Sequence, residues 1–323
     1  MIEAFAPGKC ILFGEHAVVY GHPAVAMAID QGVHVSIKKS EEWRVGGEKF
    51  DPSKHPHISY ILHEIFSYDG EPLDIKIESQ LFSAAGLGSS AALSNAIGAA
   101  LHKMIKPNEE LDIVKLAKLG HSAEAAVQEG RASPTDTAAS ALGGCVVVSG
   151  EPVKGTEHIF DTELITPEGK RSWSIFKSAL PEKKEGIWLI LGFTGESSPT
   201  GKMVAGVADL LSRVPSKKNE MDAINEITIK GLDALSRGDF EAVGLAMDEC
   251  HKHLRNLNVS SDSLDRLVEA VGPYSLGAKM TGAGGGGCMV AISRDPQRVS
   301  EQIEIAGGKP MISRIGSKGV KII

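Results

Sequence analysis

Alternating apolar and polar residues predict β-strands along much of the chain. The run Val33-His34-Val35-Ser36-Ile37 alternates with period two, as a half-buried strand does, and Leu73-Asp74-Ile75-Lys76-Ile77 repeats the pattern. The mostly apolar runs Gly144–Ser149 and Ile187–Gly192 predict strands that are more fully buried. Together these patterns predict strands at 2–6, 24–29, 32–38, 73–77, 144–149, 187–192, 275–280, 288–293 and 310–315.

Apolar residues at helical spacing predict helices elsewhere. One helical face is visible between Pro56 and Tyr68, where the apolar side chains are Ile58, Ile61, Leu62, Ile65 and Phe66. We predict further helices at about 90–103, 111–128, 200–213, 218–236, 239–256, 261–271 and 296–306. The mixed, polar segment 153–185 allows no assignment. Strands and helices mixed in two layers indicate an α+β fold.

Size and composition fit a two-domain globular protein. A chain of 323 residues is long for one hydrophobic core, so we divide it into domains at 1–185 and 186–323. Hydrophobic residues make up 42% and charged residues 23%, which are ordinary globular values. The 34 basic and 41 acidic side chains give a net charge of −7, which argues against a nucleic-acid-binding surface.

Apolar runs and cysteines bear on the cellular location. No apolar run reaches the length of a membrane span, so we expect no membrane partner. The four cysteines lack CxxC spacing, which argues against structural zinc and against a disulfide framework. They are Cys10, Cys145, Cys250 and Cys288. Reduced thiols are typical of the cytoplasm, and we predict a cytoplasmic protein.

A glycine-rich turn that leads directly into an alanine-rich helix is the first candidate site. The turn and the start of the helix comprise Ala85, Gly86, Leu87, Gly88, Ser89 and Ser90. The first N–H groups of a helix lack intrahelical partners and lie at the positive end of its dipole, and glycines let a ligand come close. The pattern favours a phosphate site, although it is not a P-loop. A helix capped by serine, without a ligand, is the alternative.

Two further glycine-containing segments lie near the two ends of the chain. The first is Ala6-Pro7-Gly8-Lys9, which leads into Phe13-Gly14-Glu15-His16-Ala17-Val18-Val19-Tyr20-Gly21. The second is Lys279-Met280-Thr281-Gly282-Ala283, which leads into Gly284–Gly287. Four consecutive glycines are costly in conformational entropy, so they indicate a close contact, with a flexible hairpin loop as the alternative.

Taken in their order along the chain, the three segments resemble the three motifs of the galactokinase, homoserine kinase, mevalonate kinase and phosphomevalonate kinase (GHMP) family. The resemblance covers residues 4 to 292, nearly the whole chain. It implies an N-terminal domain similar to the second domain of ribosomal protein S5 and a ferredoxin-like C-terminal domain. The first motif resembles that of the members that phosphorylate mevalonate, since a galactokinase would show Gly-Glu-His-Thr-Asp-Tyr there. The segment Ser133-Pro134-Thr135-Asp136-Thr137 resembles the archaeal form of these members.

The resemblance implies phosphoryl transfer from ATP, with Mg²⁺, to the 5-hydroxyl of mevalonate, a step of isoprenoid precursor synthesis. Another small alcohol is the alternative acceptor: the first motif disfavours a sugar, and a phosphorylated acceptor should need more basic residues than Lys9, Arg131 and Lys202. A nucleotide-binding sensor without catalysis is the alternative of another class. Helix-rich surfaces could support a homodimer, but the sequence identifies no face for it.

Two residues match the catalytic positions of the family. Asp136 matches the active-site aspartate, which would accept the proton of the acceptor hydroxyl or position that hydroxyl. Taken alone, it would be a helix cap or part of an Asx turn. Lys9, in a predicted Pro-Gly-Lys turn, matches the lysine that would stabilise charge at the transferred phosphoryl group. Taken alone, it would be a solvated surface lysine.

The resemblance also implies a metal site. Mg²⁺ would be held by Ser90 and by a glutamate about eleven residues before the aspartate, a position that Ala125 occupies. We therefore assign the neighbouring Glu124 and keep Glu129 as the second candidate. A solvated helical glutamate is the alternative.

For the acceptor, the resemblance implies contacts from three places in the chain. Glu15 and His16 match the acceptor-binding segment. Thr200 matches a threonine near the acceptor, with an N-cap of the helix 200–213 as the alternative. Gly284 and Gly285 belong to the loop that would lie beside the phosphates and shape the acceptor pocket.

Overall fold

Two β-sheets form the framework of the residues that the structure describes, which are 1–128, 130, 132–166, 169–181 and 186–323. The first sheet of this computed structural model contains β1 (Ile2–Phe13), β2 (Ala24–Lys39), β3 (Arg44–Val45), β4 (Glu48–Lys49), β5 (Leu73–Ser79), β6 (Cys145–Ser149), β7 (Thr156–Thr166), β8 (Gly169–Ser178) and β13 (Lys321–Ile322). The second contains β9 (Trp188–Phe193), β10 (Gly277–Thr281), β11 (Cys288–Ser293) and β12 (Lys309–Arg314), in the order β10-β11-β9-β12.

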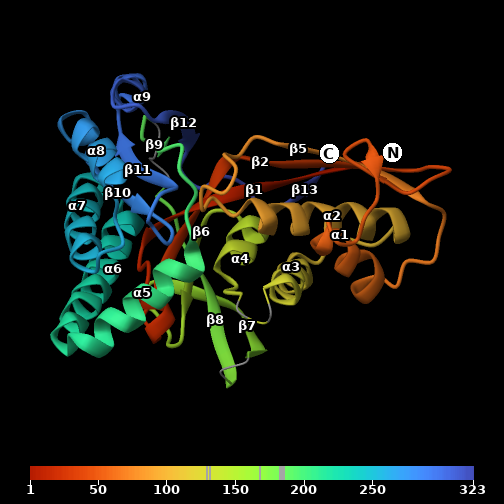
Figure 1. The fold of residues 1–323 in the computed structure, drawn as a ribbon, viewed down its shortest axis with the longest axis horizontal. Coiled ribbons are helices and arrows are strands. Elements are labelled where there is room, and N and C mark those ends of the chain that lie inside the picture. The colour runs from red at the N-terminus through yellow and green to blue at the C-terminus, as the bar shows by residue number, and fades with distance from the viewer. Residues whose placement is uncertain (129, 131, 167–168, 182–185) are drawn as a thin grey trace.

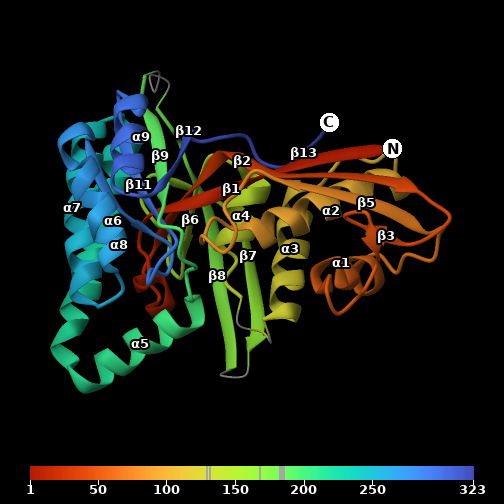
Figure 2. The same ribbon diagram turned by 45° about the horizontal axis from the view of Figure 1, so that its top comes forward.

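The helices cover these sheets in two groups. Those of the first group are α1 (Pro56–Tyr60, continued by a π-helical turn at Ile61–Ile65), α2 (Ser89–Ile105), α3 (Ile113–Val127) and α4 (Thr135–Leu142), and they lie against the first sheet (Figure 1). In the second group, α7 (Phe240–Asn256), α8 (Asp262–Val271) and α9 (Pro296–Ile305) pack on the second sheet, whereas α6 (Lys218–Arg237) packs on α7 and contacts β1 and β2. The helix α5 (Thr200–Arg213) runs apart from both groups (Figure 2). The predicted α+β class is confirmed.

The strands β1 and β2 form the long centre of the first sheet. They pair antiparallel from Ile2 opposite Ile37 to Phe13 opposite Val25, with register shifts between Pro7 and Lys9 and between Ile11 and Phe13. The predicted strands 24–29 and 32–38 are therefore one strand, and the predicted turn at Lys9 is wrong. A β-carbon built on Gly8 would lie 2.9 Å from the carbonyl oxygen of Leu87, so glycine lets β1 continue as a bulged strand close to the turn before α2.

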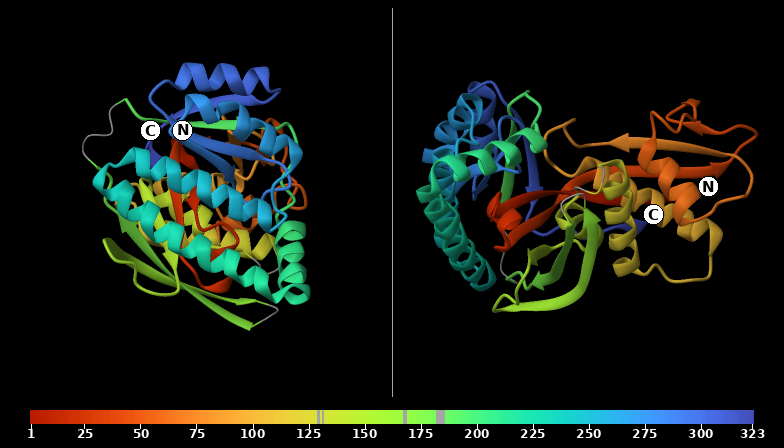
Figure 3. Two further views of the ribbon diagram at one scale, coloured as in Figure 1. Left: turned by 90° about the vertical axis from the view of Figure 1, so that its left-hand side faces the viewer. Right: turned by 60° about the horizontal axis from the view of Figure 1, so that its bottom comes forward.

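A hairpin occupies most of the segment that could not be assigned. The strands β7 and β8 pair antiparallel from Thr156 opposite Ser178 to Thr166 opposite Gly169, and β8 also pairs with β6 (Figure 3). Of its apolar side chains, Phe160, Ile175 and Phe176 are buried, whereas Ile165 is 87% exposed. The sequence pattern is weak because the hairpin lies at the end of the sheet and exposes many of its residues to water.

The second half of the chain is tied to the first sheet. β13 pairs with β1, with Ala4 opposite Ile322, and the two chain ends lie on the same side of the molecule (Figure 1). The carboxylate of Asp30 on β2 accepts hydrogen bonds from Arg314 N (3.0 Å) and Nε (2.9 Å). The domain division at 185/186 stays a prediction.

The remaining predictions concern helices and cysteines. The four helices predicted between 200 and 271 match α5 to α8 within one residue at each end. In the described part of the chain, no helix is both long and apolar enough to span a bilayer. All four cysteines are buried and free.

The contact between α7 and β10 depends on two glycines. A β-carbon built on Gly244 of α7 would overlap the carbonyl oxygen of Leu276, and one built on Gly277 would overlap the backbone of Gly244. We expect Gly244→Ala to lower the melting temperature, because overpacking costs about 1–3 kcal/mol and outweighs the gain of about 1 kcal/mol in helix propensity. Calorimetry checks this, with Gly206→Ala on α5 as the control.

The control should move in the opposite direction. A β-carbon built on Gly206 meets nothing within 4 Å, so alanine there gains helix propensity without a clash. Equal stabilisation of both variants would contradict the close backbone contact.

Candidate active site

The glycine-rich turn before α2 has the backbone of an anion site. Gly86 and Gly88 have φ angles of 75° and 73°, in the left-handed region that favours glycine. Gly88 is the N-cap of α2, and no side chain caps this helix. The alternative of a serine cap is therefore wrong. The N-terminus of a 17-residue helix is left without a side-chain cap, as an anion site requires.

Lys9 is attached to this turn from β1. Its backbone N–H donates to Leu87 O (2.9 Å), and its Nζ donates to Gly86 O (2.8 Å). A β-carbon built on Gly88 would lie 3.3 Å from Lys9 Cγ, so the turn rests on the lysine side chain. Lys9 is only 3% exposed, which excludes the alternative of a solvated surface lysine.

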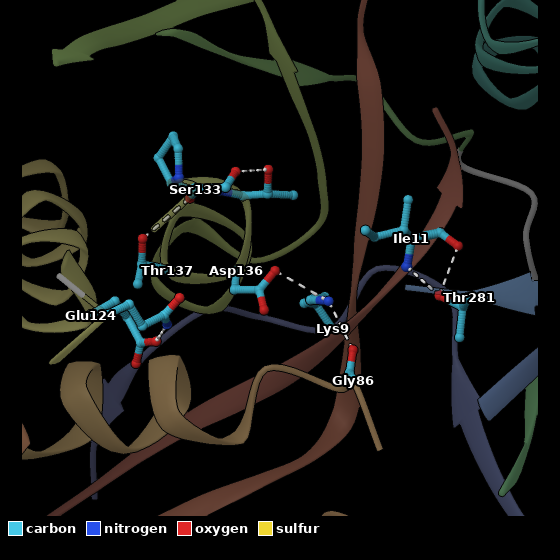
Figure 4. Close-up of polar contacts among 11 residues, drawn as sticks. Lys9, Ile11, Gly86, Glu124, Ser133, Asp136, Thr137 and Thr281 are labelled. Atoms are coloured by element: carbon cyan, nitrogen blue, oxygen red, sulfur yellow. Dashed lines mark hydrogen bonds and ion pairs between the residues drawn. The ribbon is translucent and has the colours of Figure 1, made fainter. Parts of the chain in front are cut away.

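Asp136 faces Lys9 from α4. Its Oδ1 lies 3.1 Å from Lys9 Nζ, and the two side chains point toward one another (Figure 4). The Asp136 side chain is 39% exposed and that of Lys9 is 4% exposed, so the carboxylate is open to solvent while the ammonium is covered. A carboxylate held in this way can accept a hydrogen bond or a proton from a bound hydroxyl.

The position of Asp136 is fixed through α2. Asp136 lies in the first turn of α4, whose N-cap is Pro134 without a side-chain cap, so Asp136 does not cap this helix. The buried Asn95 of α2 donates from Nδ2 to Thr137 O (2.9 Å). Because α2 starts at the glycine-rich turn, this bond fixes Asp136 relative to that turn.

The loop between β10 and β11 packs beside the glycine-rich turn before α2. Five of its residues have positive φ, namely Gly282, Gly284, Gly285, Gly286 and Gly287. A β-carbon built on Gly287 would lie 2.9 Å from Ala85 O, and one built on Gly282 would lie 3.7 Å from Gly86 O. The predicted close contact is confirmed, and it joins the second sheet to the first.

The segment that links β9 to α5 was not predicted to contribute to the site. Ser198 N donates to Ala84 O (3.0 Å), and Ser198 Oγ donates to Gly284 O (2.9 Å). Thr194 Oγ1 donates to Gly287 O (2.9 Å). Ser198 therefore links the turn before α2 to the glycine-rich loop between β10 and β11. The signal in the sequence was a run of small polar residues before a helix, which allowed only a capping interpretation.

Glu15 and His16 follow β1 and contact the second sheet. Glu15 is 2% exposed, and its Oε1 accepts a hydrogen bond from Nζ of the fully buried Lys279 on β10. His16 Nε2 donates to Ala283 O (2.8 Å). Burial raises the pKa of Glu15, which Lys279 opposes, and burial lowers the pKa of His16. Lys279 was not predicted as a site residue, although it begins the third motif.

The two predicted metal ligands lie on neighbouring helices. Ser90 is in the first turn of α2, and Glu124 lies near the end of α3. Glu124 is 6% exposed, which excludes a solvated helical glutamate. Its Oε2 accepts a hydrogen bond from Gln128 Nε2 (2.7 Å). Glu129 lies outside the described residues.

Thr200 is exposed at the start of α5. It is the first residue of the helix, whose N-cap is Pro199 without a side-chain cap, so the N-cap alternative for Thr200 is wrong. One turn later, Met203 packs on the glycine-rich loop, because a β-carbon built on Gly285 would lie 2.6 Å from its Sδ. The start of α5 thus borders the same loop as Ser198.

Comparison with known proteins gives the family of this chain. The family model described as GHMP kinases N terminal domain matches residues 57–144, and the model described as GHMP kinases C terminal matches residues 232–309. The mevalonate kinase of Pyrococcus furiosus is 35% identical over 99% of this chain and 98% of its own length. The mevalonate kinase of Pyrococcus abyssi is 34% identical over 100% of this chain and 98% of its own length.

A solved structure agrees with the sequence relatives. The crystal structure of the Methanococcus jannaschii mevalonate kinase matches with a TM-score of 0.78 and 25% identity, covering 98% of each chain. The chain therefore belongs to the GHMP kinase family, and both of the full-length relatives named above are mevalonate kinases.

Proposed function

We propose that the chain transfers the γ-phosphoryl group of ATP to the 5-hydroxyl of mevalonate, giving mevalonate 5-phosphate and ADP. The bond from the γ-phosphorus to the bridging oxygen breaks, a bond to the 5-oxygen forms, and the hydroxyl proton is released. The names of the full-length relatives support this acceptor. The observation that carries the proposal is the ion pair of Lys9 and Asp136 (3.1 Å) beside the turn at the start of α2.

The phosphates of ATP would bind at this turn, along Ala85–Ser90. The uncapped N-terminus of α2 offers backbone N–H groups and the positive end of the helix dipole. The left-handed Gly86 and Gly88 let the backbone come close to a phosphate. The glycine-rich loop beside the turn would close the site from the second sheet.

Lys9 and Asp136 would carry the transfer. An ammonium has three N–H donors. The one on Lys9 that bonds to Gly86 O leaves donors for an oxygen of the transferred group, while Asp136 Oδ1 balances the charge of the ammonium at 3.1 Å. Asp136 would accept the hydroxyl proton or hold the hydroxyl in line. Because phosphoryl transfer has a loose transition state, positioning and charge stabilisation supply most of the catalysis.

Ser90 and Glu124 suit a magnesium ion, because Mg²⁺ prefers hard oxygen ligands. Glu124 Oε1 is buried and lies 3.1 Å from His57 Nε2, yet in the described structure it has no hydrogen-bond partner. A buried carboxylate oxygen without a hydrogen bond can serve a cation. When bound, Mg²⁺ would neutralise charge on the phosphates of ATP.

We expect Glu124→Gln to raise the Mg²⁺ concentration needed for half-maximal activity, because an amide oxygen is a weaker ligand than a carboxylate. The same titration on Glu129→Gln is the comparison. A raised requirement in Glu129→Gln alone would move the metal ligand to that residue.

The acceptor would lie between the end of β1, the start of α5 and the glycine-rich loop. The end of β1 contributes Glu15 and His16, the start of α5 contributes Thr200, and the loop contributes Gly284 and Gly285. A homodimer and a cytoplasmic location stay predictions.

The test is a coupled ADP-release assay with ATP, Mg²⁺ and four acceptors: mevalonate, phosphomevalonate, galactose and homoserine. We expect turnover on mevalonate, with the 5-phosphate as product. Turnover on another acceptor alone would keep the kinase and overturn the acceptor. ATP binding without any turnover would favour a sensor.

A further inference from the structure

A fully buried charge pair lies outside the reacting groups. The exposed fraction of Lys279 is 0% and that of Glu15 is 2%. Lys279 Nζ donates to Glu15 Oε1 and to Met280 O (2.7 Å). In the described structure the second carboxylate oxygen, Glu15 Oε2, has no hydrogen-bond partner. Removing two charges from water is expensive, so either charge would be strongly unfavourable in this place without the other.

The pair lies beside a segment of unusual backbone. Gly14 and His16 both have left-handed φ angles, of 89° and 61°, and His16 is not a glycine. A β-carbon built on Gly14 would overlap Pro23 O. Such backbone persists only where its surroundings hold it. One such contact is the hydrogen bond from His16 Nε2 to Ala283 O (2.8 Å).

A second residue of β10, Thr281, also links this strand to β1. Thr281 Oγ1 accepts a hydrogen bond from Ile11 N (2.8 Å) and donates to Ile11 O (3.0 Å). The backbone of β1 is thus fixed to β10 at Ile11, and the ion pair fixes the chain again four residues later, where β1 has ended.

We propose that Lys279 is a positioning residue, which holds the segment Gly14–His16 in place through Glu15. This inference rests on the proposed function, because it assumes that the segment borders the acceptor. Glu15 is too buried to be reached freely from solvent, and one of its oxygens is already bound to Lys279. Its carboxylate therefore acts as an anchor for His16 and the turn that follows.

Lys279→Met tests the proposal. Without the ammonium, the Glu15 carboxylate is buried without a partner and must turn toward water, which displaces His16. We expect the KM for mevalonate to rise by about tenfold or more, since small misplacements of binding groups have large effects. The KM for ATP should stay unchanged, because Lys9 and the turn at Gly86 are not altered. Equal rises in both constants, or unchanged constants, would overturn the proposal.

Lys177→Met is the matched control. This lysine of β8 is partly buried and donates from Nζ to Leu142 O (3.2 Å), away from the segment Gly14–His16. The substitution Lys177→Met removes an ammonium and one hydrogen bond to a carbonyl oxygen, as Lys279→Met does. Both KM values should match those of the wild type, and a rise in the mevalonate KM equal to that of Lys279→Met would count against a specific role of Lys279.

The double variant Glu15→Gln/Lys279→Met separates anchoring from direct binding. The double variant removes both charges of the buried pair, so neither is left without its partner. It should therefore fold even if Lys279→Met does not. We expect its mevalonate KM to lie between those of the wild type and Lys279→Met, with the ATP KM unchanged. A mevalonate KM above that of Lys279→Met would mean that Glu15 binds the acceptor itself, and a wild-type value would mean that the pair positions nothing.

The wild-type enzyme distinguishes this inference from the proposed function. If it turns over another acceptor of the panel and not mevalonate, the proposed acceptor fails, and the same comparison of variants with that acceptor still decides on Lys279. If the wild type turns over mevalonate and the variants behave like it, only the role of Lys279 fails.

Discussion

Asp136→Asn is expected to lower kcat by about 10²–10⁴-fold, the usual contribution of a positioned acid or base. Asparagine keeps the shape of the side chain beside Lys9, but it can neither accept the hydroxyl proton nor carry the negative charge. The contacts expected for ATP come from the turn at Ala85–Ser90, so nucleotide binding should persist. The ADP-release assay gives kcat, and isothermal titration calorimetry gives the affinity for ATP.

Asp112→Asn is the matched control for this variant. Asp112 is the N-cap of α3 and accepts a hydrogen bond from Lys115 N (3.0 Å), a role that asparagine fills equally well. Its kcat should therefore equal that of the wild type. Full activity of Asp136→Asn would remove Asp136 from the mechanism.

Lys9→Met is expected to lower kcat by about 10²–10³-fold, the scale found when one donor to developing charge is removed. Methionine fills the space under Gly88, but it cannot donate to Gly86 O, to Asp136 or to the transferred group. The loss should appear in kcat more than in ATP affinity, because the ammonium acts at the reacting centre. Steady-state kinetics and calorimetric ATP binding measure the two effects separately.

The control for Lys9→Met is Lys115→Met. The Lys115 side chain is 85% exposed, and its ion pair with Asp112 (3.6 Å) is of the surface type that contributes little. An unchanged kcat in Lys9→Met would disprove the proposed role of Lys9. Because Lys9 and Asp136 are in contact, their effects should not add, and Asp136→Asn should cost less in the Lys9→Met background.

The sequence predicted the elements that have a regular pattern of apolar and polar residues of their own. Helices α5 to α8 have one apolar face each, and their bounds were predicted within one residue. The hairpin of β7 and β8 was not predicted, because many of its residues are exposed and polar, so apolar and polar positions do not alternate regularly. Lys9 was placed in a turn because Pro7 and Gly8 usually interrupt a strand. A β-carbon at position 8 would collide with Leu87 O and with the Leu81 side chain, so a contact made only in the fold explains the glycine within this strand.

For the site, the motifs identified its parts but not all of their contacts. Lys9, Asp136 and the turn before α2 were expected together from the family resemblance, and the structure brings them together. Glu15 and Lys279 are 264 positions apart, and no local pattern relates them. Ser198 bonds to two loops that are close only in the folded chain. Such contacts arise from tertiary structure alone.

The pairing of β13 with β1 has a consequence for biosynthesis. While the chain is being made, the edge of β1 near Ala4 stays open until Lys321 and Ile322 leave the ribosome. An open strand edge can pair with other chains, and contacts between distant residues form slowly. Of the described strands, β13 comes last in chain order, so this edge of β1 is covered only after the intervening strands have been made, and until then it can pair with another chain.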